Sequence, residues 1–370
     1  MKFSILHTEW SSGWGGQEQR IILECLKMME LGHTVVIACQ PGSGILAAAR
    51  REGIPAEEVF IRGAWDLAAV MDIRRLIRKH GITIVNTHSG KDTWVGGFAA
   101  KLAKADLLVR TRHLAIPIST NPLNFIHKMF DGFVTTGEAV RMALITKNRI
   151  PAEKVVSIPT GVSLEQFDPR LDPGELKKEL GIPSDNRVVT IVAILRKVKR
   201  HDLFLEAAAI LKGRFPTLTF LVVGEGPMRE SIEAKIDELG LAHEVILTGH
   251  RNDIPQILAI SDVVALTSDK EGVPQALTQA MAMECPVVAA PVGGIPDLII
   301  EGKTGLFADV GNAGSFADKI CILMQDSALR SELGHAARRH VLQHFTDEIM
   351  ATKTIIFYNY LLQLKQLKSR

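Results

Sequence analysis

The residues best suited to chemistry lie between positions 268 and 297. This run, SDKEGVPQALTQAMAMECPVVAAPVGGIPD, places a carboxylate, Glu271, beside a glycine and a proline where a helix should begin. The unpaired N–H groups and the dipole of a helix N-terminus favour an anion such as phosphate. A carboxylate there would repel phosphate but suits a group rich in hydroxyls. Phosphate together with a polyol suggests a nucleotide-sugar.

A basic loop follows an earlier strand-like run. Residues 195–202 are LRKVKRHD, so Arg196 and Lys199 stand among four cations in five positions. Charge-assisted bonds from such side chains would stabilise a leaving diphosphate, and the alternative is a solvated basic turn. The chain contains no D-x-D and no G-x-x-x-x-G-K-[ST]. These absences favour neutralisation by Arg and Lys without a metal and argue against a P-loop nucleotidase. We expect no cofactor.

Glycine loops follow several other strand-like runs. Gly15 and Gly16 open a helix after the first run, and glycines recur at Gly224, Gly226 and Gly249. Glycine allows the backbone to approach a ligand closely, although the same residues could serve only the turn. The first loop is G-x-G-G and the second run ends at Gln40 instead of an acid. Both features argue against the interpretation of the chain as a dinucleotide-dependent dehydrogenase.

Polar residues also end two strand-like runs of the first half. His88 lies in NTHSGKD, where it could donate to a substrate oxygen or contact a developing charge. Arg112 and His113 end the next run, and Arg112 could bind a phosphate or carboxylate on an acceptor. Single His and Arg residues are more often structural or solvated, so each is a candidate only.

These loops need a scaffold, and the pattern of the chain predicts it. Short apolar runs alternate with amphipathic stretches almost throughout, in both halves. Such alternation predicts α/β architecture, here two doubly wound parallel-sheet (Rossmann-like) domains facing a cleft. We expect an N-terminal domain over residues 1–165, a linker over 166–186, a nucleotide-sugar-binding domain over 187–345, and a C-terminal helix over 346–370 that packs on the first domain. The linker is rich in proline and glycine.

Composition narrows the class of protein. The 370 residues are 46% hydrophobic and 23% charged, with a net charge of +2, which does not indicate nucleic-acid binding. The four cysteines lie far apart and predict buried free thiols in a reducing compartment. Neither a signal peptide nor an apolar run of about 18 residues is evident. We therefore expect a cytoplasmic protein.

Taken together, these motifs resemble retaining glycosyltransferase family 4, of GT-B fold. The segment from Glu271 to Ala282 is similar to the family's E-x7-E element, and P-V-V and G-G-x-x-E-like segments follow it. The first glycine loop, the IPTGV junction near Phe167, Lys199, the G-E-G-P loop and Gly302–Gly305 match other elements in order. The style is closest to bacterial enzymes that build lipopolysaccharide or surface polysaccharide.

The resemblance implies roles for particular residues. Glu271 would hold hydroxyls of the donor sugar, position 279 the ribose hydroxyls, and His88 the transferring sugar near its reacting carbon. Arg196 and Lys199 would neutralise the diphosphate. The other donor-binding positions implied are Gly15, Gly16, Gly224, Gly226, Gly249, Gly272, Val273, Pro274 and Gln275. Candidates on the acceptor side are Trp14, Arg112 and His113.

The resemblance also implies the reaction. A hexosyl group would pass from a nucleotide-diphosphate sugar, most simply a UDP-sugar, to a glycan or glycolipid. The transfer would retain the anomeric configuration and would need no metal. The leaving diphosphate would take the acceptor proton on the same face, because no second carboxylate is an obvious nucleophile. Peripheral contact with the inner face of the membrane is a further expectation, through residues 121–130 or the basic residues 74–79.

This chain departs from the family pattern in three places. The second acid of E-x7-E is Gln279, which can bond ribose hydroxyls without charge assistance, at a loss of ~1 kcal/mol. The usual G-R-L is AILR, which shifts Arg196, and the last acid of G-G-x-x-E is the shorter Asp297. Two alternatives therefore stay open: a sugar-nucleotide epimerase of the same fold, and a non-catalytic sugar-nucleotide-binding protein.

Overall fold

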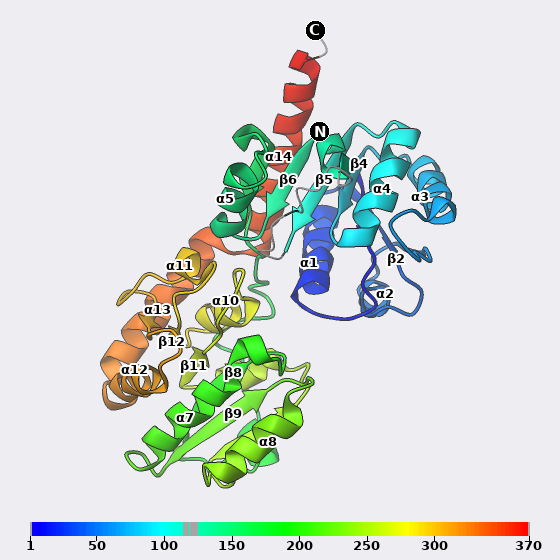
Figure 1. The fold of residues 1–370 in the computed structure, drawn as a ribbon. Coiled ribbons are helices and arrows are strands. Elements are labelled where there is room, and N and C mark those ends of the chain that lie inside the picture. The colour runs from blue at the N-terminus through cyan, green and yellow to red at the C-terminus, as the bar shows by residue number, and fades with distance from the viewer. Residues whose placement is uncertain (1, 114–117, 119–124, 369–370) are drawn as a thin grey trace. The chain divides into compact units, whose positions relative to one another are not determined.

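A computed structural model of the chain describes residues 2–113, 118 and 125–368 (Figure 1). The chain divides into two compact units. Unit 1 combines Met1–Gly161 with the C-terminal Asp347–Arg370, and unit 2 is Val162–Thr346. Of the segment 121–130 that the sequence offered for membrane contact, residues 121–124 lie outside the described part, and a 3-10 helix covers Phe125–Met129.

Unit 1 is built on a parallel sheet whose strands, within the described residues, follow the order β3-β2-β1-β4-β5-β6-β7. The strands are β1 (Ser4–Glu9), β2 (Thr34–Cys39), β3 (Ala56–Glu58), β4 (Ile84–Thr87), β5 (Leu107–Arg112), β6 (Gly132–Thr135) and β7 (Val155–Ser157). The helices are α1 (Gly16–Glu30), α2 (Gly44–Arg51), α3 (Leu67–Lys79), α4 (Gly90–Ala103), α5 (Glu138–Thr146) and α14 (Asp347–Lys368).

Local chemistry explains how these helices begin and which face they bury. The Asp66 side chain accepts a hydrogen bond from the backbone N–H of Ala69 at 3.2 Å and caps α3. Val70, Ile73 and Ile77 recur every three or four residues and are buried. This spacing places them on one face of the helix, where burying an aliphatic side chain contributes about 1.5–3 kcal/mol.

The C-terminal helix α14 belongs to unit 1, where it runs beside the sheet (Figure 1). Tyr358 of this helix is fully buried, and its hydroxyl accepts a hydrogen bond from the Asn86 side-chain amide at 3.1 Å. A β-carbon on Gly132 would lie 2.4 Å from a methyl group of Leu361, so the strand needs glycine where α14 crosses it. The last helix therefore completes the core of the first unit.

Unit 2 repeats the plan with the strand order β10-β9-β8-β11-β12-β13, again parallel. Its strands are β8 (Arg187–Val192), β9 (Leu218–Val223), β10 (Val245–Gly249), β11 (Val263–Leu266), β12 (Val287–Ala289) and β13 (Leu306–Phe307). Its helices are α6 (Leu176–Glu179), α7 (His201–Lys212), α8 (Arg229–Glu238), α9 (Ile254–Ala259), α10 (Gln275–Ala282), α11 (Ile295–Leu298), α12 (Ala313–Gln325) and α13 (Ser327–His344).

The expected fold class is confirmed, since each unit is a parallel sheet covered by helices. In each sheet the winding reverses at one point, between β1 and β4 in unit 1 and between β8 and β11 in unit 2. Ligands of open α/β sheets bind beyond the carboxyl ends of the strands at such a reversal.

All four cysteines are buried and free. No helix in the described part of the chain is long and apolar enough to cross a membrane.

Candidate active site

The reversal point of unit 2 holds the pair that the sequence singled out. Lys199 follows β8 and Glu271 follows β11, and the Lys199 Nζ lies 2.6 Å from the Glu271 Oε1. The two side chains retain 22% and 8% of their exposed surface, so the pair is well shielded from water. One cation and one carboxylate therefore lie together at the carboxyl ends of the strands. The Lys199 ammonium can bind phosphate there, and the Glu271 carboxylate can bind hydroxyls.

Hydrogen bonds hold the two loops together. The Thr267 hydroxyl donates to the backbone carbonyls of Lys199 and Arg200, at 3.0 and 2.8 Å. The Asp269 N–H donates to the Val198 carbonyl at 2.9 Å, and the Asp269 carboxylate accepts from the Arg200 guanidinium at 3.1 Å. The Lys199–Glu271 pair thus stands on a fixed frame, as positioning in catalysis requires.

A glycine turn supports the Glu271 loop from behind. Gly293 has φ +59°, and a β-carbon there would lie 1.9 Å from the Glu271 carbonyl oxygen. The Gly294 N–H donates to the Gly272 carbonyl at 2.9 Å. These contacts explain why the sequence has two glycines after β12, because any side chain at Gly293 would displace the Glu271 backbone.

Helix α10 presents two glutamines beside this loop. Pro274 is its N-cap, and Gln275 and Gln279 stand one turn apart on the same face. Both polar atoms of the Gln275 amide are buried without a hydrogen-bond partner, as is the Ser268 hydroxyl on the same loop. Such groups normally find a partner, so they mark a place for water or ligand. Sequence reasoning included Gln275 but missed Ser268, whose type carries no signal by itself.

Arg196 is placed differently from Lys199. Its side chain is exposed and lines a cavity of about 490 Å³ with Met228 and Lys235. Among the described residues, no hydrogen bond or ion pair joins the Arg196 side chain to Glu271, whereas Lys199 forms both. The structure therefore brings Lys199, but not Arg196, to the carboxylate.

The glycines of the neighbouring loops are required by close backbone contacts. Gly224 has φ +145°, and a β-carbon there would lie 2.0 Å from the Ala193 carbonyl oxygen. A β-carbon on Gly226 would lie 2.6 Å from the Leu195 carbonyl oxygen, and the Gly224 N–H donates to the Gly249 carbonyl at 2.9 Å. These glycines thus bring the loops after β8, β9 and β10 together.

The reversal point of unit 1 holds a chain of three histidines. The Nδ1 of His7, in β1, lies 2.9 Å from the Nε2 of His88, which follows β4. The Nδ1 of His88 lies 3.0 Å from the Nε2 of His113, which follows β5. Both ring nitrogens of His88 are therefore occupied. Among the described residues, the two ends of this series, the Nε2 of His7 and the Nδ1 of His113, have no hydrogen-bond partner, and the Nε2 of His7 is buried.

Burial keeps these imidazoles neutral. It lowers the pKa of His7 to about 3, with a further contribution from the Arg20 cation. Burial also lowers the pKa of His88 and of His113 well below the usual range. Each neutral ring carries one N–H and one lone pair, so the contacts form a continuous donor-to-acceptor chain. Sequence reasoning missed His7, which follows the apolar Ile5 and Leu6 inside β1, before the loop where ligands were expected.

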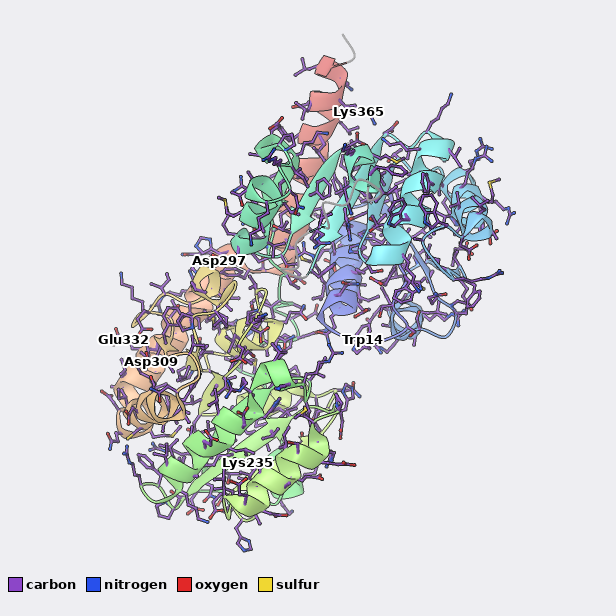
Figure 2. All side chains as sticks on the ribbon, viewed as in Figure 1. Trp14, Lys235, Asp297, Asp309, Glu332 and Lys365 are labelled. Carbon is purple, nitrogen blue, oxygen red and sulfur yellow. The ribbon has the colours of Figure 1, made fainter. Side chains whose placement is uncertain are left out.

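The first glycine loop begins at a buried carboxyl group. Glu9 ends β1 and accepts hydrogen bonds from the Ser11 N–H, at 2.7 Å, and from the Gln17 side-chain amide. Burial, followed by the charge of Asp92, raises the pKa of Glu9 to about 8. Gly15 is the N-cap of α1 and Gly16 is its first residue. Trp14 lies just before them with an exposed ring (Figure 2).

The two arginines of β5 point to the same face of the strand, two residues apart. Burial, and next the Arg112 cation, lowers the pKa of Arg110 to about 9. The Arg110 guanidinium lies 2.9 Å from the Nδ1 of His127. Arg112 is less buried, and desolvation lowers its pKa as well. Arg110 was missed from the sequence because it lies inside the strand, before the loop where ligands were expected.

Two parallel α/β units with polar loops at their reversal points are the architecture of the GT-B glycosyltransferases, and solved structures agree. A glycosyltransferase from Rickettsia africae superposes with a TM-score of 0.88 at 23% identity, covering 98% of this chain and 99% of its own. The Anabaena protein HepE, solved in complex with UDP and glucose, gives 0.85 at 22% identity, covering 96% and 99%. At these identities the similarity shows the fold.

Family models and curated relatives take the identification further. The family described as Glycosyltransferase Family 4 matches residues 14–166, and Glycosyl transferases group 1 matches residues 172–340. The Escherichia coli UDP-Gal:alpha-D-GlcNAc-diphosphoundecaprenol alpha-1,3-galactosyltransferase is 28% identical over 71% of this chain and 72% of its own. The N-acetyl-alpha-D-glucosaminyl L-malate synthase of Bacillus anthracis is 27% identical over 82% and 81%. The chain belongs to glycosyltransferase family 4 and is a glycosyltransferase.

Proposed function

We propose that this glycosyltransferase transfers a hexosyl group from a nucleotide-diphosphate sugar, with a UDP-sugar as the first candidate, to a glycan or glycolipid acceptor. The transfer retains the anomeric configuration, needs no metal, and serves the synthesis of lipopolysaccharide or surface polysaccharide. The observation that carries this proposal is the Lys199–Glu271 pair at the reversal point of unit 2.

The chemistry of the pair fits such a donor. The ammonium and the carboxylate neutralise each other at 2.6 Å. When a donor binds, Lys199 stabilises the charge that develops on the leaving diphosphate, and Glu271 accepts hydrogen bonds from sugar hydroxyls. The Gln275 amide, buried without a partner, supplies a donor and an acceptor for the same ligand.

The names of relatives support the donor and acceptor classes. The Escherichia coli relative is named for UDP-Gal and for an acceptor on diphosphoundecaprenol. A further relative, from Staphylococcus aureus, is named as a capsular polysaccharide biosynthesis glycosyltransferase and is 24% identical over 80% of this chain. The first name supports a UDP-sugar donor and a sugar acceptor on a diphosphate carrier, and the second supports a role in polysaccharide synthesis.

On the side of unit 1, we propose that His113, not His88, contacts the substrates. The ring nitrogens of His88 are held by two other imidazoles. The Nδ1 of His113 has no hydrogen-bond partner among the described residues, so it can bond a substrate oxygen. His88 then acts through His113, by fixing which of its nitrogens carries the proton.

A thermal-shift panel of UDP-, GDP- and ADP-sugars tests the donor. A donor at about 100 times its Kd should stabilise the native chain by about 2.7 kcal/mol. We expect the largest shift with a UDP-sugar and its loss in Lys199→Ala. Lys212→Ala is the matched control. Lys212 pairs with Glu244 at the amino end of β10, whereas Lys199 lies beyond the carboxyl ends of the strands of the same sheet. If no nucleotide-sugar shifts the wild type, the proposed donor class is wrong.

Turnover with the bound donor then tests the rest of the proposal. We expect activity in excess chelator and an α-linked product from an α-linked donor, assigned by NMR. Loss of activity in chelator with rescue by magnesium would contradict metal independence. A β-linked product would contradict retention. Free nucleotide released with an epimerised sugar and no acceptor would instead indicate the epimerase alternative.

A further inference from the structure

Unit 2 contains a cavity between α7 and α8, the two helices that follow β8 and β9 (Figure 1). Its volume is about 490 Å³, and small-molecule sites occupy about 300–1,000 Å³. Neither Lys199 nor Glu271 lines it. This cavity, called the α7–α8 cavity below, is therefore distinct from the candidate active site.

A buried histidine lines the α7–α8 cavity. His201, the first residue of α7, is 3% exposed, and neither of its ring nitrogens has a hydrogen-bond partner among the described residues. Burial, followed by the charge of Lys199, lowers the pKa of His201 to about 4, so the neutral ring offers one N–H and one lone pair. Buried polar groups normally find a partner. The two nitrogens therefore indicate that a bound molecule completes this site.

The lining also carries positive charge that no acid neutralises. It contains four Lys or Arg and three Asp or Glu. Two of the cations pair with the three acids at 2.8 to 3.7 Å, as Arg200–Asp202, Lys235–Glu238 and Lys235–Glu206. The other two, Arg196 and Lys197, are exposed, and their side chains form no hydrogen bond or ion pair within the described part of the chain. Two adjacent cations are thus available to an anion.

We propose that the α7–α8 cavity binds a small organic phosphate. The Arg196 guanidinium and the Lys197 ammonium bind the phosphate through charge-assisted hydrogen bonds. His201 bonds a hydroxyl group of the same molecule, whose carbon skeleton packs on Leu205 and Met228 of the lining. A macromolecule is a poorer occupant, because its surface cannot reach a side chain as deeply buried as His201.

One short turn carries both the phosphate-binding cations and Lys199. Lys197–Lys199 forms a 3-10 helix, and Arg196 is its N-cap. A ligand that holds Arg196 and Lys197 therefore also restrains the backbone that presents Lys199 to Glu271. The site itself stands independently of the proposed donor, because none of its contacts involves the Lys199 or Glu271 side chain.

Isothermal titration calorimetry of the full-length chain, without donor or acceptor, tests this site. The probes are glucose 6-phosphate, glycerol 3-phosphate, glucose and inorganic phosphate. We expect binding of at least one of the two organic phosphates, weaker binding of inorganic phosphate, and none of glucose, because only an organic phosphate meets the cations and His201 together. Lys197→Ala should weaken binding about fivefold, and His201→Leu about tenfold.

Two matched variants locate the bound phosphate. Lys212→Ala removes a cation from the other end of α7 and should bind as the wild type does. Lys199→Ala should bind within about twofold of the wild type, because its side chain faces Glu271. Equal losses in Lys199→Ala and Lys197→Ala would place the phosphate at the active site instead and overturn the proposal.

The stability of His201→Leu gives a second readout. Leucine leaves no buried nitrogen unpaired, so the urea midpoint of this variant should not fall although its phosphate binding does. A lower midpoint would show that the His201 nitrogens have a structural partner and would contradict their role toward a ligand. Lys197 is exposed, so Lys197→Ala tests the site whether or not His201→Leu folds. No binding of either organic phosphate, or equal affinity for inorganic phosphate, overturns the proposal.

Discussion

Replacing Glu271 by alanine should reduce turnover by ~10²-fold or more while the chain still folds. The carboxylate is 8% exposed, follows β11, and touches the Lys199 ammonium. If it holds two sugar hydroxyls in the transition state, each charge-assisted hydrogen bond contributes about 1.5–3 kcal/mol. A loss of about 2.7 kcal/mol corresponds to a hundredfold slower reaction. The expected effect therefore lies at or above that value.

The cost to stability should be much smaller. The Lys199 ammonium keeps 22% of its exposed surface, so water can solvate it once the carboxylate is gone. We expect the free energy of unfolding to fall by about 1 kcal/mol. Glu244→Ala is the matched control, because it removes a carboxylate 2.9 Å from Lys212 at the opposite edge of the same sheet.

The assay is steady-state transfer with the donor that gives the largest thermal shift, together with urea unfolding of each variant. Glu271→Ala should lose turnover with a native-like unfolding curve, and Glu244→Ala should keep turnover. Turnover of Glu271→Ala near that of the wild type would refute the assigned role. Equal loss of turnover in both variants would show that charge alone, rather than position, matters.

Three further predictions concern the supporting residues. Gly293→Ala should cost at least about 2 kcal/mol more than Gly302→Ala in urea unfolding, because a β-carbon meets the Glu271 carbonyl at 1.9 Å in the first case and nothing within 4 Å in the second. Glu9 binds a proton more tightly when folded, with a pKa of about 8 against 4.5, so the stability it contributes falls as pH rises between these values. The free energy of unfolding should fall by at most about 1.4 kcal/mol per pH unit in this range, and Glu9→Gln should reduce that slope. An unchanged dependence of the unfolding free energy on pH in Glu9→Gln would contradict the raised pKa of Glu9. His113→Ala should lower kcat more than His113→Asn, whose amide can still donate, and equal kcat values would argue against a substrate contact.

The sequence by itself determined the class of architecture and named the candidate residues of the donor side. Alternating apolar runs and amphipathic stretches predict parallel sheets under helices, because each element must bury one face. Glu271 and Lys199 could be chosen because each follows a strand, and the ends of parallel strands meet at one edge of a sheet. These inferences depend on residue type and local spacing, which the sequence contains in full.

Tertiary structure decided which candidates meet. Lys199 contacts Glu271 across 72 positions because β8 and β11 are neighbours in the sheet, and strand order is not written in either loop. His7 joins His88 and His113 because β1, β4 and β5 are adjacent, and nothing in its own strand indicates those partners. Likewise, the raised pKa of Glu9 depends on burial and on Asp92, far away in the sequence. Burial and long-range adjacency arise only when the whole chain is folded, and that is the physical reason why the sequence could name single residues but not the groups they form.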